Sequence, residues 1–382
     1  MHALARRPVR RLLPPIAALM LLLAVAGQVA ALSTYYPIQS LGNRGSDVRA
    51  LQYLLRAAGR DVSVTGQFGS STRAAVVAHQ KARALPATGV VNDPTWRSLT
   101  PNLSMGSSGD AVRALQRLLN DKRKAGLTVS GTYGTGTRDA VTAFQRHMTS
   151  TSSGSMDAFT WRRLLWHFEP PVWGSTSGLC DYSVGNGPAN WGTGAAIGQL
   201  RTAAKHIYDA GHGRVAVGDI GFEHGGDIPG HETHEQGLDV DVRPMRDAEN
   251  QCSSPTNYRQ TAYDRAATRA LIREIRAAAP GHVKVIYFND PVLIGEGLTT
   301  RLAGHDDHVH VRYCEAWHPV IAYRCASTAG ASSSANAHRV WTNPWAHRGQ
   351  LMATYSRPDW KAELPPQTAL RQAHLPANSQ RS

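Results

Sequence analysis

The sequence predicts a multidomain protein in which two all-α three-helix modules precede an α+β domain with a small antiparallel sheet. An internal repeat, whose apolar residues have helical spacing, occupies residues 40–166 and predicts the two modules. Residues 179–326 mix helix-like and strand-like segments without regular alternation, which favours an α+β arrangement. The length of 382 residues is sufficient for two or three domains with cores of their own.

The composition is that of a folded, strongly basic protein. Charged residues make up 18% of the chain and hydrophobic residues 42%, which excludes a mostly disordered chain. The formal net charge of +13 favours an anionic partner: nucleic acid, an anionic membrane surface or an anionic wall polymer. Charge alone does not distinguish these partners. The compartment in which the protein works decides which of them it can meet.

The N-terminus has the order of a secretory signal peptide, with basic residues before an apolar run. The basic residues are Arg6, Arg7, Arg10 and Arg11. The apolar run covers residues 16–31, and cleavage after Ala31 would remove a signal peptide of residues 1–31. An uncleaved membrane anchor is the alternative, although the run is shorter than the roughly 20 apolar residues that span a bilayer. Export argues against nucleic acid as a partner and against stable membrane insertion after cleavage.

Four cysteines suggest two disulfides in an exported chain. They are Cys180, Cys252, Cys314 and Cys325. The sequence allows three pairings, of which Cys314 with Cys325 closes the shortest loop and leaves Cys180 with Cys252. Cysteine ligands for zinc would need closely spaced pairs of the CxxC type, and the sequence has none.

The repeat in the first half of the chain is in register apart from one inserted residue. Residues 45–55 return as 109–119 at an offset of 64, and residues 96–99 return as 161–164 at an offset of 65. Each copy predicts three short helices with an apolar stripe that forms the core of a small bundle. The residues expected in these cores include Leu51, Leu55, Val76, Trp96 and Trp161.

The ends of these helices are predicted from local signals. Asp47 and Asp110 occupy the positions where N-caps would satisfy the free amides of the first helices. A glycine–aromatic–glycine turn leads into second helices over residues 72–82 and 137–147.

The repeat carries the pattern D-V-x-x-L-Q-x-x-L, then G-x-F/Y-G-x-x-T, then A-V-x-x-F-Q and T-W-x-x-L. This pattern resembles the bacterial peptidoglycan-binding three-helix domain, present as residues 40–101 and 103–166. The family usually has an aspartate before the first loop glycine, where this chain has Thr65 and Ser130. The resemblance implies binding to peptidoglycan, and a tandem would prolong attachment to the wall through effective concentration.

The rest of the chain divides into a linker over residues 167–178, an α+β domain over 179–326, and a linker with an unassigned tail over 327–382. Within the α+β domain, helices are expected over residues 195–210 and 262–279, and strands over 214–217 and 283–288.

Two further segments of the α+β domain combine strand patterning with acidic and histidine residues. Their ranges are 225–243 and 305–312. Near its end, each segment alternates apolar and polar residues, as a strand with one buried face does. Asp239 and Asp241 share one face of the first strand, and His308 and His310 share one face of the second. If the two strands are neighbours, carboxylates and imidazoles converge on one point.

A turn at Gly237 would bring His234 back to the same point. Two histidines, one aspartate and an open position are how proteins hold a catalytic zinc ion together with a reactive water. The residues therefore predict a zinc-dependent hydrolase.

The composite G-G-x-x-x-x-H-x-x-H-x-x-G-L-D-V-D-V, followed by H-D-x-H-x-H-V-R, resembles the penicillin-insensitive murein endopeptidases, which are zinc peptidases that cut wall peptides. The resemblance implies that His234, Asp241 and His310 hold the zinc ion, with His231 as a further ligand. It also implies that His308 and His305 lie beside the metal.

The roles of the remaining polar residues follow from what peptide hydrolysis needs. His308 shares a strand face with His310, so it is the expected general base or transition-state stabiliser, with His305 and Asp307 as alternatives. Asp239 is expected to orient a ligand histidine.

Other histidines near the motif are not assigned to it. His231 and His234 are three residues apart, which excludes an HExxH zinc motif. His224 and His282 are expected to be ordinary surface histidines.

These observations predict an exported, zinc-dependent peptidoglycan endopeptidase that hydrolyses stem-peptide cross-links and is tethered to the wall by tandem binding modules. The expected partners are the glycan and stem peptides of peptidoglycan, with anionic wall polymers as further candidates. Two other specificities remain open, a D-alanyl-D-alanine carboxypeptidase and an L-alanyl-D-glutamate endopeptidase. The alternative of another class is a non-catalytic cell-wall-binding protein.

Overall fold

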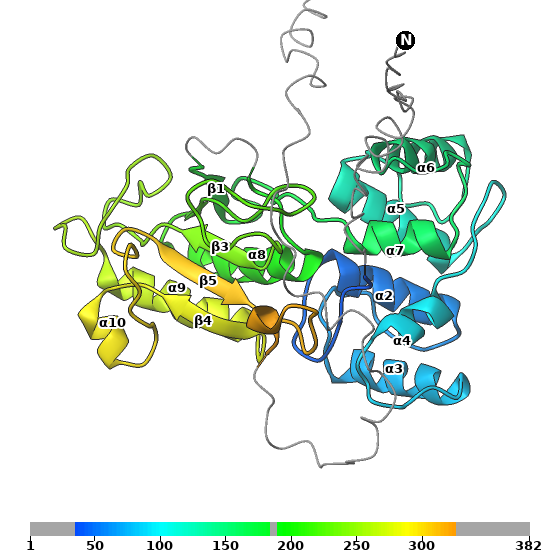
Figure 1. Ribbon diagram of the computed structural model, residues 1–382, viewed down its shortest axis with the longest axis horizontal. Coiled ribbons are helices and arrows are strands. Elements are labelled where there is room, and N and C mark those ends of the chain that lie inside the picture. Colours follow the sequence, from blue (N-terminus) through cyan, green and yellow to red (C-terminus); the bar gives the residue numbers. More distant parts are fainter. Residues whose placement is uncertain (1–34, 184–188, 326–382) are drawn as a thin grey trace, which may run out of the picture. The chain divides into compact units, whose positions relative to one another are not determined.

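The computed structural model describes residues 35–183 and 189–325 (Figure 1). These residues belong to one compact unit of the chain, residues 1–327. The predicted signal peptide (residues 1–31) and C-terminal tail (residues 327–382) lie outside the described residues. Within the described ranges, no helix is both long and apolar enough to cross a membrane.

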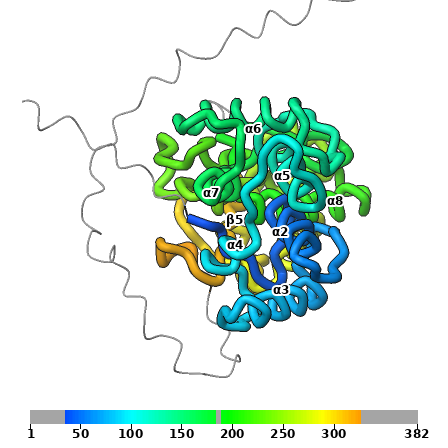
Figure 2. Tube along the Cα trace, turned by 90° about the vertical axis from the view of Figure 1, so that its right-hand side faces the viewer, coloured from blue at the N-terminus to red at the C-terminus, as the bar shows by residue number. Residues whose placement is uncertain are grey.

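The repeat forms two three-helix modules, as predicted. Module 1 contains α2 (Ser46–Ala57), α3 (Ser70–Ala82) and α4 (Asp93–Leu99). Module 2 contains α5 (Asp110–Arg123), α6 (Thr135–His147) and α7 (Ala158–Trp166). Helices α2 and α5 pack side by side (Figures 1 and 2), and the apolar residues of both modules form one continuous core. Because that core is shared, the two modules are a single packed body.

The prediction that Asp47 and Asp110 cap the first helices is wrong. The N-caps are Gly45 and Gly109, with φ of 116° and 101°, and no side chain caps either helix. Each glycine amide instead bonds to a loop carbonyl of its own module. Asp47 lies inside the first turn, where it is buried and pairs with Lys122 at 2.9 Å. The N-cap expectation failed because the partner of Asp47 is a distant residue of the other module.

The glutamines of the repeat motif hold the loops of the modules. The side-chain oxygen of Gln52 accepts a hydrogen bond from the amide of Gly66 at 2.8 Å, and its Nε2 donates to the carbonyl of Gln67 at 3.0 Å. The same clamp recurs at Gln80, Gln116 and Gln145. These glutamines are buried, so the polar part of the motif satisfies backbone groups that would otherwise lack partners.

The C-terminal part is an α+β domain, as predicted, with a five-stranded sheet in the order β1-β2-β3-β5-β4. The strands are β1 (Leu179–Asp181), β2 (Val215–Val217), β3 (Asp239–Val242), β4 (Val283–Tyr287) and β5 (Val309–Tyr313). The helices are α8 (Gly194–Asp209), α9 (Arg265–Ala278), α10 (Pro291–Gly295) and a 3₁₀ turn, η1 (Ile321–Tyr323). The sheet is mixed, because β1 and β2 are parallel while every other pair is antiparallel. The parallel pair arises because α8 forms the crossover between these two strands.

Helices α8 and α9 pack together and cover one face of the sheet (Figure 1). The valines of β3 and β5 are buried in the core beneath these helices. Because successive side chains of a strand point to opposite faces, the polar residues of β3 and β5 lie on the other face. The sheet therefore separates the core of the domain from its polar site.

Two disulfides are present, Cys180–Cys252 and Cys314–Cys325, at sequence separations of 72 and 11 residues. This is the pairing that loop length slightly favoured. The first joins β1 to the segment after β3, and the second joins the end of β5 to residues after η1. Both cross-links therefore restrain segments at the ends of the sheet.

Module 1 packs closely on the α+β domain. A Cβ atom on Gly45 would lie 2.0 Å from the carbonyl oxygen of Gly194, at the start of α8. His282 is 3% exposed, and its Nε2 lies 3.1 Å from the carbonyl of Leu41 in module 1. The expectation that His282 is a surface histidine is therefore wrong, because the module covers it.

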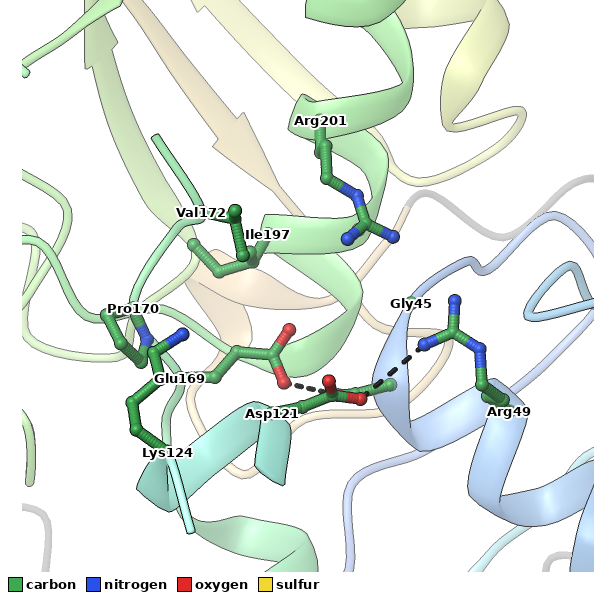
Figure 3. Close-up of a pocket in the computed structure, with 11 residues that line it drawn as sticks. Gly45, Arg49, Asp121, Lys124, Glu169, Pro170, Val172, Ile197 and Arg201 are labelled. Carbon is green, nitrogen blue, oxygen red and sulfur yellow. Dashed lines mark hydrogen bonds and ion pairs between the residues drawn. The ribbon is translucent and has the colours of Figure 1, made fainter. Parts of the chain in front are cut away.

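A pocket lies where α2, α5 and α8 meet (Figure 3). Figure 3 shows Arg49, Asp121, Glu169 and Arg201 around this pocket. Burial raises the pKa of Glu169 to about 7, with nearby Lys122 acting in the opposite direction. A titratable carboxyl group thus lies inside the junction between the modules and the α+β domain.

Candidate active site

The pairing of β3 with β5 places the predicted site residues opposite each other. In the antiparallel register, Asp241 faces His310 and Asp239 faces Arg312. Directly opposed side chains on one face of an antiparallel pair have Cβ atoms about 5 Å apart. The two strands therefore bring carboxylates and an imidazole together.

The loop before β3 contributes His234. Its backbone has φ of 78°, in the left-handed region that a non-glycine residue rarely occupies. The amide of His234 donates to Asp239 Oδ2 at 3.2 Å, and Gly237 follows with φ of 62°. His234 is fully buried. A rare backbone conformation that is held in place by a hydrogen bond is typical of functional sites.

Donor atoms of three residues meet in one place, with both carboxylate oxygens of Asp241 taking part. The Nε2 of His234 lies 3.3 Å from Nδ1 of His310 and 3.3 Å from Oδ2 of Asp241. The Nδ1 of His310 lies 3.0 Å from Oδ1 of Asp241. Two ligands that are each about 2.0–2.1 Å from a zinc ion, at the tetrahedral angle, are about 3.3 Å apart. The two separations of 3.3 Å match that value, and the separation of 3.0 Å is somewhat shorter.

The hydrogen bond made by the outer nitrogen of each imidazole determines whether the inner nitrogen, which faces Asp241, carries a proton. His310 Nε2 lies 2.9 Å from Asp239 Oδ1, and His234 Nδ1 lies 3.3 Å from the carbonyl of Ile220. Both partners accept hydrogen bonds, so these nitrogens carry the protons. Burial lowers the pKa of His310, but without a cation Asp239 and Asp241 outweigh it and raise that pKa to about 9, so the ring is protonated. A cation that displaces this proton would find His234 Nε2 and His310 Nδ1 facing Asp241 as ligands.

The carboxylates of the site are held in the charged form. Burial raises the pKa of Asp241, but His234 and His310 outweigh it and bring that pKa well below its usual range. Burial likewise opposes the lowering of the Asp239 pKa, which is caused by His310 and Arg312. Oδ1 of Asp241 is buried without a hydrogen-bond donor in the described part of the chain. This unsatisfied anionic oxygen fits a metal ligand.

The hydrogen bonds around the site also orient its members. Asp239 Oδ1 accepts from Arg312 Nε at 2.7 Å, and Asp239 Oδ2 accepts from the hydroxyl of Tyr323 at 2.6 Å. Asp239 thereby orients the ring of His310, as expected of a residue that orients a ligand histidine. Tyr323 was not foreseen, because it lies 84 residues after Asp239 and belongs to no motif.

His231 lies at the edge of this group. Its Nδ1 is 3.9 Å from Oδ2 of Asp241, and its Nε2 is 3.0 Å from Oδ2 of Asp219. His231, His234 and Asp241 each offer a donor atom within 4.8 Å of the others, so these three residues form a group that is able to hold a metal ion. Asp219 holds the other ring nitrogen of His231 and was also not foreseen from the sequence.

His308 and His305 lie beside the site and are partly exposed. Nε2 of His308 is 3.9 Å from Oδ1 of Asp241, while its Nδ1 is 2.9 Å from Oδ1 of Asp307. The ring of His305 lies 4.7 Å from that of His308 and 5.5 Å from that of His310, centroid to centroid. The side chain of His308 is 25% exposed, so it can reach both the site and a substrate.

The comparisons with known proteins fit this arrangement. Residues 44–99 and 108–164 match the family model described as "Putative peptidoglycan binding domain". Residues 186–286 match the model described as penicillin-insensitive murein endopeptidase. The chain thus has two peptidoglycan-binding domains followed by a murein endopeptidase domain. The endopeptidase match includes His231, His234 and Asp241 and ends before His310.

One solved structure among the matches is a peptidoglycan-binding protein from Clostridioides difficile in complex with glutamine hydroxamate. It is 39% identical over 16% of this chain and 39% of its own length, with a TM-score of 0.16. The comparison with curated proteins finds no significant match. The family matches therefore assign peptidoglycan-binding domains and a murein endopeptidase domain to these segments of the chain.

Proposed function

We propose that the chain is an exported, zinc-dependent peptidoglycan endopeptidase that hydrolyses stem-peptide cross-links while its two modules hold it on the wall. The observation that supports it most is the meeting of donor atoms from His234, Asp241 and His310 at separations of 3.0 to 3.3 Å, close to the value for two ligands of a tetrahedral zinc ion. Two imidazoles and a carboxylate are a donor set that suits zinc. With three protein ligands, a position remains for water.

The residues around the metal position supply the remaining chemistry. When bound, a zinc ion lowers the pKa of its water to about 7 and polarises the scissile carbonyl. His308 Nε2 faces the site and is placed to accept the proton of the attacking water and to return it to the leaving amine. Asp307 holds the other nitrogen of His308, which fixes its tautomer. His231 is proposed as a further ligand, which together with the water would make the site five-coordinate, and His305 is proposed as the alternative base.

The preferred bond is proposed to be a stem cross-link between D-alanine and a diamino acid, by resemblance to the murein endopeptidases. A D-alanyl-D-alanine carboxypeptidase and an L-alanyl-D-glutamate endopeptidase are the alternatives within the same chemistry. The net charge of +13 suits a wall that carries anionic polymers. Export is proposed from the signal-like residues 1–31.

The test is digestion of purified sacculi by the full-length mature protein, with the released fragments identified by mass spectrometry. Conversion of cross-linked peptides into un-cross-linked ones is expected, and a chelator should stop it. His310→Ala is the control and should abolish cleavage while leaving binding to sacculi intact. If the only product is terminal D-alanine, the protein is a carboxypeptidase and the endopeptidase proposal is wrong. Protein without zinc and without cleavage would support the non-catalytic alternative.

A further inference from the structure

A second group of ligand-type side chains lies between module 2 and the loop that joins β2 to β3. His147 is the last residue of α6, and His167 directly follows α7. Glu223 and His224 belong to the loop that also carries His231 and His234. Each of the four residues offers one donor atom, and these atoms all lie within 4.8 Å of one another. His224, which was expected to be an ordinary surface histidine, is partly buried in this group.

The distances between donor atoms in this group match those between two ligands of a small metal ion. Nε2 of His147 and Nε2 of His167 lie 3.1 Å and 3.5 Å from Oε1 of Glu223. These values bracket the separation of about 3.3 Å expected between two ligands of a tetrahedral zinc ion. The ring of His224 lies 5.0 Å from that of His147 and 5.3 Å from that of His167, centroid to centroid.

The protonation of the group also favours a cation. Nδ1 of His167 lies 2.6 Å from the carbonyl of Phe168, which can only accept, so its Nε2 carries a lone pair. The Nε2 atoms of His147 and His167 are both buried and face Glu223, yet neither makes a hydrogen bond of good geometry with a described residue. His167 is fully buried.

Arg123 also contacts Oε1 of Glu223, so a metal-free network of ionic hydrogen bonds is the competing interpretation. That network accounts for the charge of Glu223. It leaves the inward nitrogens of His147 and His167 without hydrogen bonds, at a cost of about 1–3 kcal/mol for each buried polar group. A carboxylate has about four acceptor positions, so Glu223 can serve Arg123 and an ion together.

We propose that His147, His167, Glu223 and His224 form a second divalent-metal site of the zinc type, with four protein ligands and a structural role. Four protein ligands without an open position are typical of structural zinc. The ion would join module 2 to the loop that carries His231 and His234. Phe168, the residue after His167, also packs on this loop. Its ring lies so close to Gly237 that a Cβ atom there would be 2.8 Å from it.

The first test is the zinc content of the full-length mature protein after gel filtration without added metal. The unmodified protein should carry two zinc ions, and His147→Gln and His224→Gln should each carry one. His206→Gln is the matched control, since His206 is an exposed histidine that pairs with Glu274 on the α+β domain, and it should keep two. A single zinc ion in the unmodified protein, unchanged in His147→Gln, would overturn the proposal.

The second test removes the candidate active site from the measurement. In the His310→Ala background, Co²⁺ should give the visible absorption of a tetrahedral site, and adding His147→Gln or His224→Gln should abolish it. Circular dichroism establishes that the compared variants are folded, and having two independent ligand variants covers the failure of one to fold. If the absorption persists unchanged in both double variants, the proposal of a second site is wrong. Because this readout needs no catalysis, it is independent of the endopeptidase proposal.

Discussion

At the scale of single residues, the two histidines of β5 differ in what they can do. His310 has one nitrogen 2.9 Å from Asp239 and the other facing His234 and Asp241, so both of its nitrogens are engaged within the site. His308 is held by Asp307 on one side and has its other nitrogen beside the site. The proposed function therefore assigns metal binding to His310 and proton transfer to His308.

The first prediction separates these roles. His308→Gln should lower the rate of cross-link cleavage by about 100- to 10,000-fold, the usual contribution of a general acid–base group. Its zinc content should stay that of the unmodified protein, because His308 is not in the proposed ligand set. Fragment release from sacculi and metal analysis of the same sample check both parts.

His305→Gln is the comparison, since His305 is the alternative base. It should reduce the rate less than His308→Gln does. A larger loss in His305→Gln would transfer the proton-transfer role to His305.

The residue scale also shows what the sequence could predict. Alternation in two short segments placed Asp239, Asp241 and His310 on one side of a sheet, and the register of β3 with β5 brings them together. The sequence could not show that Tyr323 supports Asp239, because that contact depends on how a distant turn folds back. His224 was missed for the same reason, since its neighbours His147 and His167 lie in α6 and directly after α7, far away in the sequence.

At the scale of helices and strands, the repeat predicted the six module helices because each copy carries its own periodic apolar stripe. The prediction failed where a residue has a distant partner. Asp47 looks like an N-cap from its neighbours, but Lys122 draws it into a buried ion pair. The parallel pairing of β1 with β2 was likewise missed, because β1 has only three residues and no alternation that could show its direction.

The segment after α7 gives the second prediction, which concerns pH. Glu169 is 6% exposed, accepts a hydrogen bond from Ser46, and has its pKa raised to about 7 by burial, against an ordinary value of 4.5. A raised pKa in the folded state favours the protonated form. The stability that Glu169 contributes is therefore complete below pH 4.5 and is lost as the pH rises through 7.

Glu169→Gln should reduce this loss, which is at most roughly 3 kcal/mol. The free energy of unfolding, measured in denaturant from pH 4.5 to 8, should decline less steeply in Glu169→Gln than in the unmodified protein. Glu296→Gln is the control, because the pKa of that exposed carboxylate is lowered by Arg269 and its removal should not flatten the decline. Equal slopes in Glu169→Gln and the unmodified protein would contradict the prediction.

At the scale of the whole molecule, the close contact between module 1 and the α+β domain gives the third prediction. Gly45 and Gly109 are equivalent residues of the two modules, with nearly the same backbone angles. A Cβ atom on Gly45 would collide with Gly194, whereas a Cβ atom on Gly109 would have nothing within 4 Å. Substituting each residue separates backbone strain from damage to the contact between module 1 and the α+β domain.

Gly109→Ala should lower the free energy of unfolding by about 1–3 kcal/mol, the cost of a side chain in this backbone region. Gly45→Ala should pay the same strain and lose about 1–3 kcal/mol more, because the new methyl group overpacks the contact. Thermal and denaturant unfolding of the full-length proteins measure both values, and limited proteolysis shows whether module 1 has loosened. Equal losses in the two variants would mean that the contact with α8 adds nothing to stability.

The shared core of α2 and α5 has a consequence for attachment to the wall. Two binding units on a flexible string can adapt to many arrangements of glycan, whereas two that are fused through one core offer their ligand surfaces at a single separation and angle. We expect such a pair to prefer strands whose spacing fits it. Since the catalytic part is fastened to the same body, the bond that is cut should lie at a constant offset from the place of attachment.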